Sequence, residues 1–389
     1  MSVTTNPSYK PLTDNTAIAL AKRLKLFEEN AALTSYQLDD GHSNLLFRII
    51  DEKNKRGIII KQAKSILDAS IEGNSLFISG NSVPEFVPKV YYHDSSLAVT
   101  VMEDLSHLQT SRKGLIERKS LPSLSKHIGT YLARTLFYTS DFALGSKKKK
   151  ELLHTFIKSE SCKLTDELVF SIPFFNIDSP PLAVDLEKDV QQILNNQELK
   201  IEVGNLKRKF LTQADALIHG NLHTGNILAN DIETKVIDPS FAFYGPFGYD
   251  IGQFMAHLII LAISQNEADR QTLLDHIDCT WQVFTDTFRE LWMNGNQEIY
   301  STVDGFIDEI VKEIFEDAIG FAGCELIRQT TNVAHATVLD QITEKTARLK
   351  AKRYALSLGQ QLITNRRTFS ETKHINEYIN NYAKKTVVS

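Results

Sequence analysis

A change in hydrophobic pattern near residue 104 constrains the fold more than any other feature of this sequence. Before it, short runs rich in β-branched residues, such as Leu45–Ile50 and Ile58–Lys61, flank polar turns. After it, apolar residues recur at helical spacing, and Phe254–Ile263 is almost continuously apolar. We therefore predict an α+β fold with two lobes. Residues 1–104 form a small antiparallel β lobe, and residues 105–389 form a larger, mostly helical lobe.

Local signals place further elements in both lobes, and the length of 389 residues is ample for two of them. In the first lobe we expect helices over Thr16–Leu26 and Ser65–Phe77, and strands over Lys89–His93 and Leu97–Met102. In the second lobe we expect helices over His127–Thr139, Glu151–Ser159, Lys200–Thr212 and Tyr249–Ser264, and a loop rich in Pro and Ser over Phe170–Ala183.

Composition excludes several classes of partner. The formal net charge of −5 gives no electrostatic reason to expect nucleic acid or an anionic membrane as a partner. The three cysteines, Cys162, Cys279 and Cys324, are far apart and lack the spacing of metal ligands, so we expect reduced thiols in the cytoplasm. The first residues lack the apolar core of a signal peptide. The run Phe254–Ile263 is about half the ~20 residues of a membrane span.

The strongest chemical signal lies in Leu217–Leu228, which contains His219-Gly-Asn221 and, a few residues later, Asn226. A short strand then leads to Asp238. An amide oxygen and a carboxylate on neighbouring loops are the hard donors that hold Mg²⁺ against nucleotide phosphates. We therefore predict phosphoryl transfer, with Asn226 and Asp238 as metal ligands and His219 and Asn221 in the catalytic loop.

Upstream residues fit a site for ATP. Lys61 ends an apolar strand, and Glu72 follows on the predicted helix, where it can pair with the lysine and direct it toward phosphates. The other predicted nucleotide contacts are Asp40, Gly41 and Asn44, in a turn before the first strand, and Met102, Glu103 and Asp104, in the connector that ends the sheet lobe.

The segment Thr234–Gly252 resembles the 5-methylthioribose kinases, which belong to the aminoglycoside-phosphotransferase-like branch of the protein-kinase-like fold. The same resemblance is carried by Val99–Leu108, Gly129–Phe137 and Gly320–Arg328, and it extends from Leu12 to about Phe369. It implies ATP and Mg²⁺ as cofactors, and phosphorylation of the 1-hydroxyl of 5-methylthioribose in methionine salvage. It also implies a substrate contact by Arg328 and a homodimer that takes a small sugar.

The sequence departs from the family where the chemistry lies. Asn221 and Ser240 replace the acidic residues of His-Gly-Asp and Asp-Pro-Glu, Gln329 replaces the second of two arginines, and a Trp-containing segment is missing between Lys61 and Glu72. The lost base is worth about 10²–10⁴-fold in rate, so we expect a slow kinase. Two alternatives stay open: a transfer-deficient pseudokinase that binds a nucleotide or metabolite, and a kinase for a different small alcohol.

Overall fold

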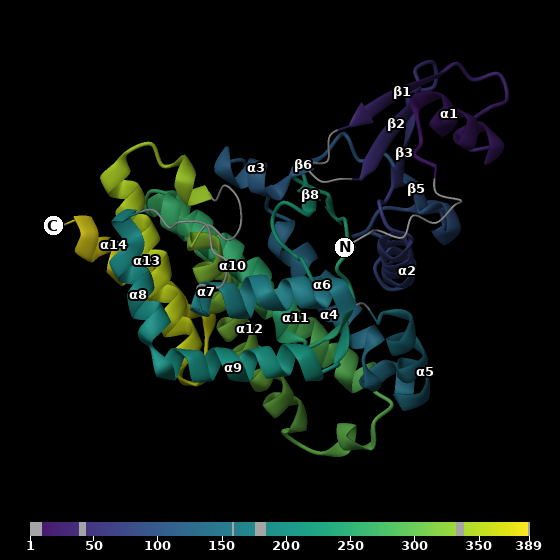
Figure 1. Ribbon diagram of the computed structural model, residues 1–389. Helices are drawn as coiled ribbons and strands as arrows, with labels where there is room; N and C mark the ends of the chain where they lie inside the picture. Colours follow the sequence, from purple (N-terminus) through teal and green to yellow (C-terminus); the bar gives the residue numbers. More distant parts are fainter. Residues whose placement is uncertain (1–9, 39–43, 158, 176–183, 332–337, 388–389) are drawn as a thin grey trace. The chain divides into compact units, whose positions relative to one another are not determined.

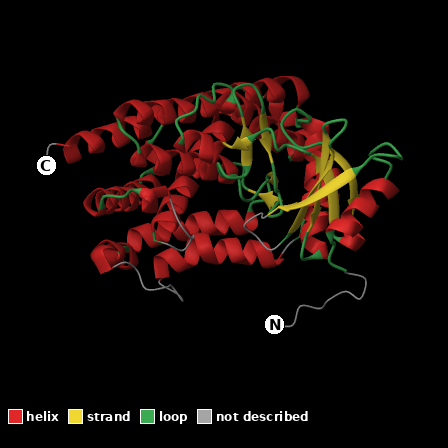
Figure 2. Cartoon of the chain, turned by 90° about the horizontal axis from the view of Figure 1, so that it is seen from above, coloured by secondary structure: helices red, strands yellow, loops and turns green. Residues whose placement is uncertain are grey.

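The computed structural model describes residues 10–38, 44–157, 159–175, 184–331 and 338–387 (Figure 1). The chain divides into two compact units, of which the first is Met1–Gln109 with Lys235–Ala242 and the second is Thr110–Thr234 with Phe243–Ser389. Figure 2 shows one sheet of long strands and a larger set of helices. The α+β class is confirmed. The sequence predicts a single boundary after residue 104, whereas the structure also assigns 235–242 to the first unit.

The first unit is built on a five-stranded antiparallel sheet of order β1-β2-β3-β5-β4. Its strands are β1 (Leu33–Leu38), β2 (Leu45–Asp51), β3 (Arg56–Gln62), β4 (Val90–Asp94) and β5 (Val99–Glu103), and its helices are α1 (Asp14–Arg23), α2 (Ile66–Ser82) and the short η1 (Ser95–Leu97). The expected hairpin and the expected helices are present, with Thr13 and Ser65 as side-chain caps. Strand β1 is not among the expected elements.

The strand register places the core residues on one face of this sheet and Lys61 on the other. Phe47 lies opposite Ile60, which lies opposite Val101, so these side chains form one row of the core that α1 covers. Since side chains alternate along a strand, Lys61 points to the other face, where Glu72 of α2 accepts its hydrogen bond. A shift of one residue in β3 would exchange the two faces.

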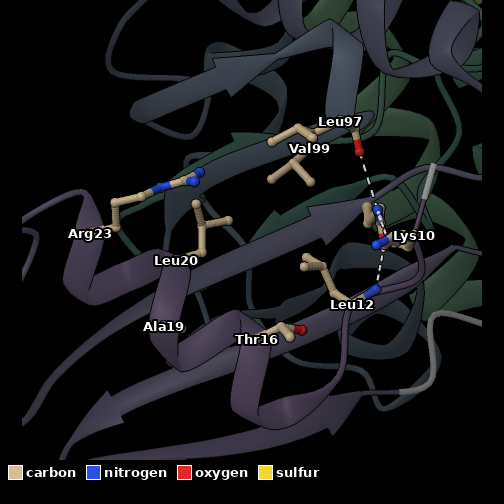
Figure 3. Close-up of a pocket in the computed structure, with 9 residues that line it drawn as sticks. Lys10, Leu12, Thr16, Ala19, Leu20, Arg23, Leu97 and Val99 are labelled. Carbon is tan, nitrogen blue, oxygen red and sulfur yellow. Dashed lines mark hydrogen bonds between the residues drawn. The ribbon is translucent and has the colours of Figure 1, made fainter. Parts of the chain in front are cut away.

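A buried glutamine, Gln62, connects the segment before α1 to the sheet. The Gln62 side chain accepts from the Leu12 amide at 2.8 Å and donates to the carbonyls of Lys10 and Leu97 at 3.1 and 3.2 Å. Beside it lies a pocket of about 310 Å³, with apolar walls and with Lys10 and Arg23 on its lining (Figure 3). None of the predicted site residues lines this pocket.

The second unit is mostly helical, with short strands around the predicted catalytic segment. Its helices are α3 (Ser111–Ile116), α4 (Leu124–Thr139), α5 (Asp141–Thr155), α6 (Ser159–Asp166), α7 (Ile172–Phe175), α8 (Glu187–Asn195), α9 (Gln197–Thr212), α10 (Gly248–Ser264), α11 (Glu267–Gly295), α12 (Phe306–Thr330), α13 (Lys345–Thr364) and α14 (Thr372–Val387). Its short helical turns are η2 (Glu167–Ser171), η3 (Val184–Leu186), η4 (Ile299–Thr302), η5 (Val338–Gln341) and η6 (Arg366–Thr368). Strands β7 (Ala216–Ile218) and β10 (Phe243–Gly245) pair antiparallel, and β8 (Ile227–Ala229) also belongs to this unit. Two more short strands, β6 (Gln109–Thr110) and β9 (Thr234–Val236), include residues of both units.

Helix α10 is the centre of the second unit and is buried on nearly all sides, as its apolar run predicts. Close packing against α12 depends on glycine: a Cβ at Gly252 would lie 2.5 Å from the Ala318 carbonyl. Even this helix is too short in its apolar part to cross a membrane, and the same holds for every helix in the described ranges.

Two expectations for this unit are wrong in part. The stretch from Phe170 to Phe175, expected as loop, forms η2 and α7, while 176–183 lie outside the described residues. Burial of the Phe170 ring against Phe210 and Phe321 outweighs the helix-breaking composition. The helix expected from Glu151 to Ser159 begins earlier, at Asp141, and ends at Thr155.

Candidate active site

Lys61 lies between two carboxylates of the first unit. Its Nζ is 3.0 Å from Glu72 and 2.7 Å from Asp238, and its side chain is 9% exposed. Burial alone would lower the pKa of Lys61, but the charges and hydrogen bonds of Glu72 and Asp238 raise it above the ordinary value. The lysine is therefore permanently charged and held in one position, as a phosphate-binding lysine must be.

Asp238 can contact Lys61 because the segment that contains it, residues 235–242, folds as part of the first unit although it is distant in sequence. The backbone amide of Val236 donates to the Phe86 carbonyl at 2.7 Å. The side-chain Nζ of Lys235 donates to the Val87 carbonyl at 3.2 Å. Asp238 itself has a φ of 60°, a left-handed conformation that is uncommon for residues other than glycine. Such strain persists where the surroundings enforce it, and it occurs often at functional sites.

The predicted connector residues have structural partners for their side chains. Met102 is buried in β5, and Asp104 forms an ion pair with Arg48 at 2.8 Å. The Glu103 carboxylate accepts from the Lys89 amide at 3.1 Å. An adenine contact by this connector would therefore use backbone groups.

The predicted turn before β2 is described only at its end. Asp40 and Gly41 lie outside the described residues. Asn44 is partly buried and immediately precedes β2. A role of this turn in covering phosphates stays a prediction.

The predicted catalytic loop of the second unit, residues 219–226, is held by a buried carboxylate. Asp250, in the first turn of α10, accepts the amide of His219 at 2.6 Å and that of Gly220 at 3.0 Å. Gly220 has a φ of 78°, which favours glycine at this turn. Burial raises the pKa of Asp250, while His219 and the two amides oppose the rise. Because both amides donate to one rigid side chain, the loop has a defined position.

Asn221 and Asn226 are joined within this loop. The Asn226 Nδ2 donates to the Asn221 carbonyl at 3.1 Å, so the Asn226 Oδ1 is the atom left to accept or to bind a cation. The backbone N–H of Asn221 donates to His219 Nδ1 at 3.3 Å. Within the described ranges, the Asn221 side chain makes no hydrogen bond of its own. The loop thus presents neutral oxygens where the family has a carboxylate.

Arg328 is held by a carboxylate that the sequence interpretation missed. Glu325 is fully buried and accepts from Arg328 Nε at 2.6 Å and Nη2 at 2.5 Å. It also accepts from Gln329 at 2.8 Å and lies 3.3 Å from His257 Nε2. Burial alone would raise the pKa of Glu325, but Arg328 and His257 hold it well below its usual value. The spacing of three residues between Glu325 and Arg328 on one helix was the available signal.

Comparison with known proteins connects this geometry to a family. The model of the phosphotransferase enzyme family matches residues 37–275, more than half of the chain. A methylthioribose kinase of Geobacillus sp. (strain WCH70) is 51% identical over 379 residues, which cover 94% of this chain and 95% of the relative. One from Geobacillus thermodenitrificans (strain NG80-2) is 49% identical over 385 residues, 96% of this chain and 97% of the relative.

Solved structures support the same fold. An ethanolamine kinase of Plasmodium vivax matches with a TM-score of 0.50 and 14% identity, and the match covers 91% of both chains. The resemblance predicted from the sequence is confirmed: the chain belongs to the phosphotransferase enzyme family and, within it, to the methylthioribose kinases.

Proposed function

We propose that this chain transfers the γ-phosphoryl group of ATP to the 1-hydroxyl of 5-methylthioribose, at a reduced rate. The observation that carries the proposal is the buried Lys61, which is held by Glu72 and Asp238 and keeps its positive charge. A lysine is rarely buried unless its charge is paired, and strongly shifted pKa values cluster at functional sites. Two relatives named methylthioribose kinase, which are 51% and 49% identical to this chain, support methylthioribose as the substrate.

The proposed reaction forms one oxygen–phosphorus bond and breaks another. The 1-hydroxyl oxygen of the sugar bonds to the γ-phosphorus, and the bond from that phosphorus to the bridging oxygen breaks, so ADP leaves with the electron pair. Lys61 stabilises charge on the ATP phosphates. The hydroxyl proton passes to water, because the amide of Asn221 is not a base at neutral pH.

The proposed donors for Mg²⁺ are the Asp238 carboxylate and the Asn226 Oδ1. Both are hard oxygens of the kind that this ion prefers, so the residues fit it. When bound, the ion would neutralise charge on the phosphates. In the described part of the chain no three His, Cys, Asp or Glu side chains group around a metal position.

Asn221 favours a second candidate, a pseudokinase that binds nucleotide and transfers little. Phosphoryl transfer relies mainly on positioning and charge neutralisation, so a missing base slows the reaction before it abolishes it. We rank the slow kinase first because Asp250 still fixes the loop and Lys61 still carries its two carboxylates.

Calorimetric titration of Mg-ATP and then of methylthioribose into the full chain separates the two candidates. Formation of the sugar phosphate is followed in the same samples by phosphorus NMR. Binding of both ligands with slow product formation supports the proposed function. Binding of nucleotide without binding of the sugar and without product rejects it in favour of the pseudokinase.

A further inference from the structure

Arg112 is anchored to the catalytic loop of the second unit. Its backbone amide donates to the Thr224 carbonyl at 2.9 Å, and the hydroxyl of buried Ser111 donates to the same carbonyl at 2.9 Å. Both residues begin α3, so the helix and the loop of residues 219–226 are fastened together at this point. The guanidinium of Arg112 therefore has a defined position beside the loop, although no part of the proposed mechanism uses it.

The loop itself leaves room for this guanidinium. A Cβ at Gly225 would lie 3.3 Å from the Arg112 Cζ and 2.9 Å from the His223 ring. His223 Nδ1 accepts from the Gly225 amide at 3.0 Å and lies 3.4 Å from Arg112 Nη2, so the ring proton is on Nε2. An imidazole is never negatively charged at neutral pH, so His223 does not compensate the charge of the arginine.

The charges around Arg112 do not balance. Its Nε is buried without a hydrogen-bond partner, and none of the described carboxylates lies within ion-pair distance of it. Glu325 is the carboxylate that interacts electrostatically with Arg112, but it already accepts hydrogen bonds from Arg328 and Gln329. Arg328 and Glu325 cancel, and His257, which lies beside Glu325, supplies no negative charge. One positive charge is left over.

A partly buried charge without a partner is costly in a folded protein, and a bound anion removes that cost. A guanidinium matches phosphate oxygens well, since its planar fork can donate two parallel hydrogen bonds. We propose that Arg112 binds the phosphate group of a phosphorylated small sugar, so that the cluster of Arg112, His223 and Arg328 is a phosphate-monoester subsite in the second unit. The identity of the sugar rests on the proposed function, whereas the anion does not.

This subsite gives the enzyme a preference for its product over its substrate. A sugar that carries the phosphate gains the Arg112 contact, and the unphosphorylated sugar does not. The phosphorylated sugar is therefore expected to bind more tightly and to inhibit by product retention. Removal of the arginine should speed release while it weakens binding of the monoester.

Calorimetry on the full chain without ATP tests the subsite directly. The probes are 5-methylthioribose 1-phosphate, 5-methylthioribose and inorganic phosphate. Arg112→Met should weaken binding of the monoester by about 10-fold or more, the usual worth of a charge-assisted hydrogen bond. Lys113→Met is the matched control, because it removes the same charge from the next, exposed residue of α3. It should change the affinity by less than about 2-fold.

Stability provides a readout that a structural arginine would not give. Since Arg112 has no ion-pair partner among the described residues, Arg112→Met should unfold at the wild-type temperature or above it, whereas loss of a structural arginine lowers the unfolding temperature. If the methionine variant does not fold, Arg112→Lys is measured instead. The lysine keeps the positive charge but cannot donate two parallel hydrogen bonds as a guanidinium does, so this variant should bind the monoester less tightly than wild type.

The outcomes distinguish this inference from the proposed function. Loss of monoester affinity in Arg112→Met, with none in Lys113→Met, supports the subsite even if wild type transfers no phosphoryl group. Equal monoester affinity in wild type and Arg112→Met overturns the subsite even if transfer is observed. Failure of the wild type to bind the monoester more tightly than the free sugar overturns it as well.

Discussion

Restoring the missing base at position 221 is the most informative single change. Asn221→Asp replaces an amide by a carboxylate of the same shape. The side chain of Asn221 makes no hydrogen bond within the described ranges, and Asn226 bonds to its backbone carbonyl, which the change keeps. The loop is positioned by Asp250, which accepts the backbone amides of His219 and Gly220. The substitution therefore adds a base and removes no described contact.

The expected magnitude follows from the role of the base. General-base assistance is worth about 10²–10⁴-fold, and at 1.36 kcal/mol for each tenfold change this lowers the barrier by about 3–5 kcal/mol. We expect kcat with methylthioribose to rise by that factor. In the variant, kcat should also fall at acid pH as the introduced carboxylate becomes protonated near the ordinary aspartate pKa of about 4, a limb that the wild type lacks.

The assay follows ADP release at saturating Mg-ATP and sugar, with the sugar phosphate identified by phosphorus NMR. Asn230→Asp is the matched control, because the Asn230 Oδ1 accepts the amides of Ile232 at 3.0 Å and Glu233 at 2.8 Å, which a carboxylate also accepts. A rate for Asn221→Asp within about 3-fold of wild type would refute the reasoning, since it would separate residue 221 from the reacting hydroxyl.

Three further predictions concern binding and stability. Lys61→Met leaves Glu72 buried without its cation, so we expect a loss of about 3–5 kcal/mol in the free energy of unfolding, together with loss of Mg-ATP binding by calorimetry. Burial raises the pKa of Asp215 to about 6. Its contribution to the free energy of unfolding is therefore full below pH ~4 and is lost as pH rises through ~6, by at most about 3 kcal/mol, and Asp215→Asn should flatten this dependence in urea unfolding. Gly252→Ala should lower stability by about 1–3 kcal/mol through overpacking against α12, whereas Gly204→Ala, whose Cβ meets nothing within 4 Å, should raise it by about 0.5–1 kcal/mol in thermal unfolding.

Each of these predictions has a contradicting result. Wild-type affinity for Mg-ATP in Lys61→Met would remove the lysine from the nucleotide site. An unchanged pH dependence in Asp215→Asn would mean that the carboxyl titrates at its ordinary pKa. Equal effects of alanine at Gly252 and Gly204 would mean that helix propensity, and not the close approach to Ala318, decides the outcome.

Prediction from the sequence was strongest where the signal is local. The β2–β3 hairpin and the helix that carries Glu72 follow from alternation, turn residues and caps that lie within a few residues of one another. The family assignment was equally accessible, because its motifs are contiguous stretches of sequence. Strand β1 was missed, since its six residues are mostly exposed and carry little apolar alternation.

Long-range packing decided the features that local sequence signals did not predict. The Phe170 segment became helical because distant aromatic rings bury it, which no local propensity records. Likewise, nothing near Asp238 in the sequence shows that it pairs with Lys61, which is 177 residues away. Such a contact depends on how the whole chain folds.

The fold class, the family and the residue types available for phosphoryl transfer follow from the amino-acid sequence alone, because they depend on local periodicity and on contiguous motifs. The tertiary structure alone decided how charge is distributed. It placed a second carboxylate on Lys61, neutralised Arg328 with a buried Glu325, and gave Arg112 no compensating charge from any described residue. Electrostatic energies depend on distance and burial, and both are properties of the folded chain.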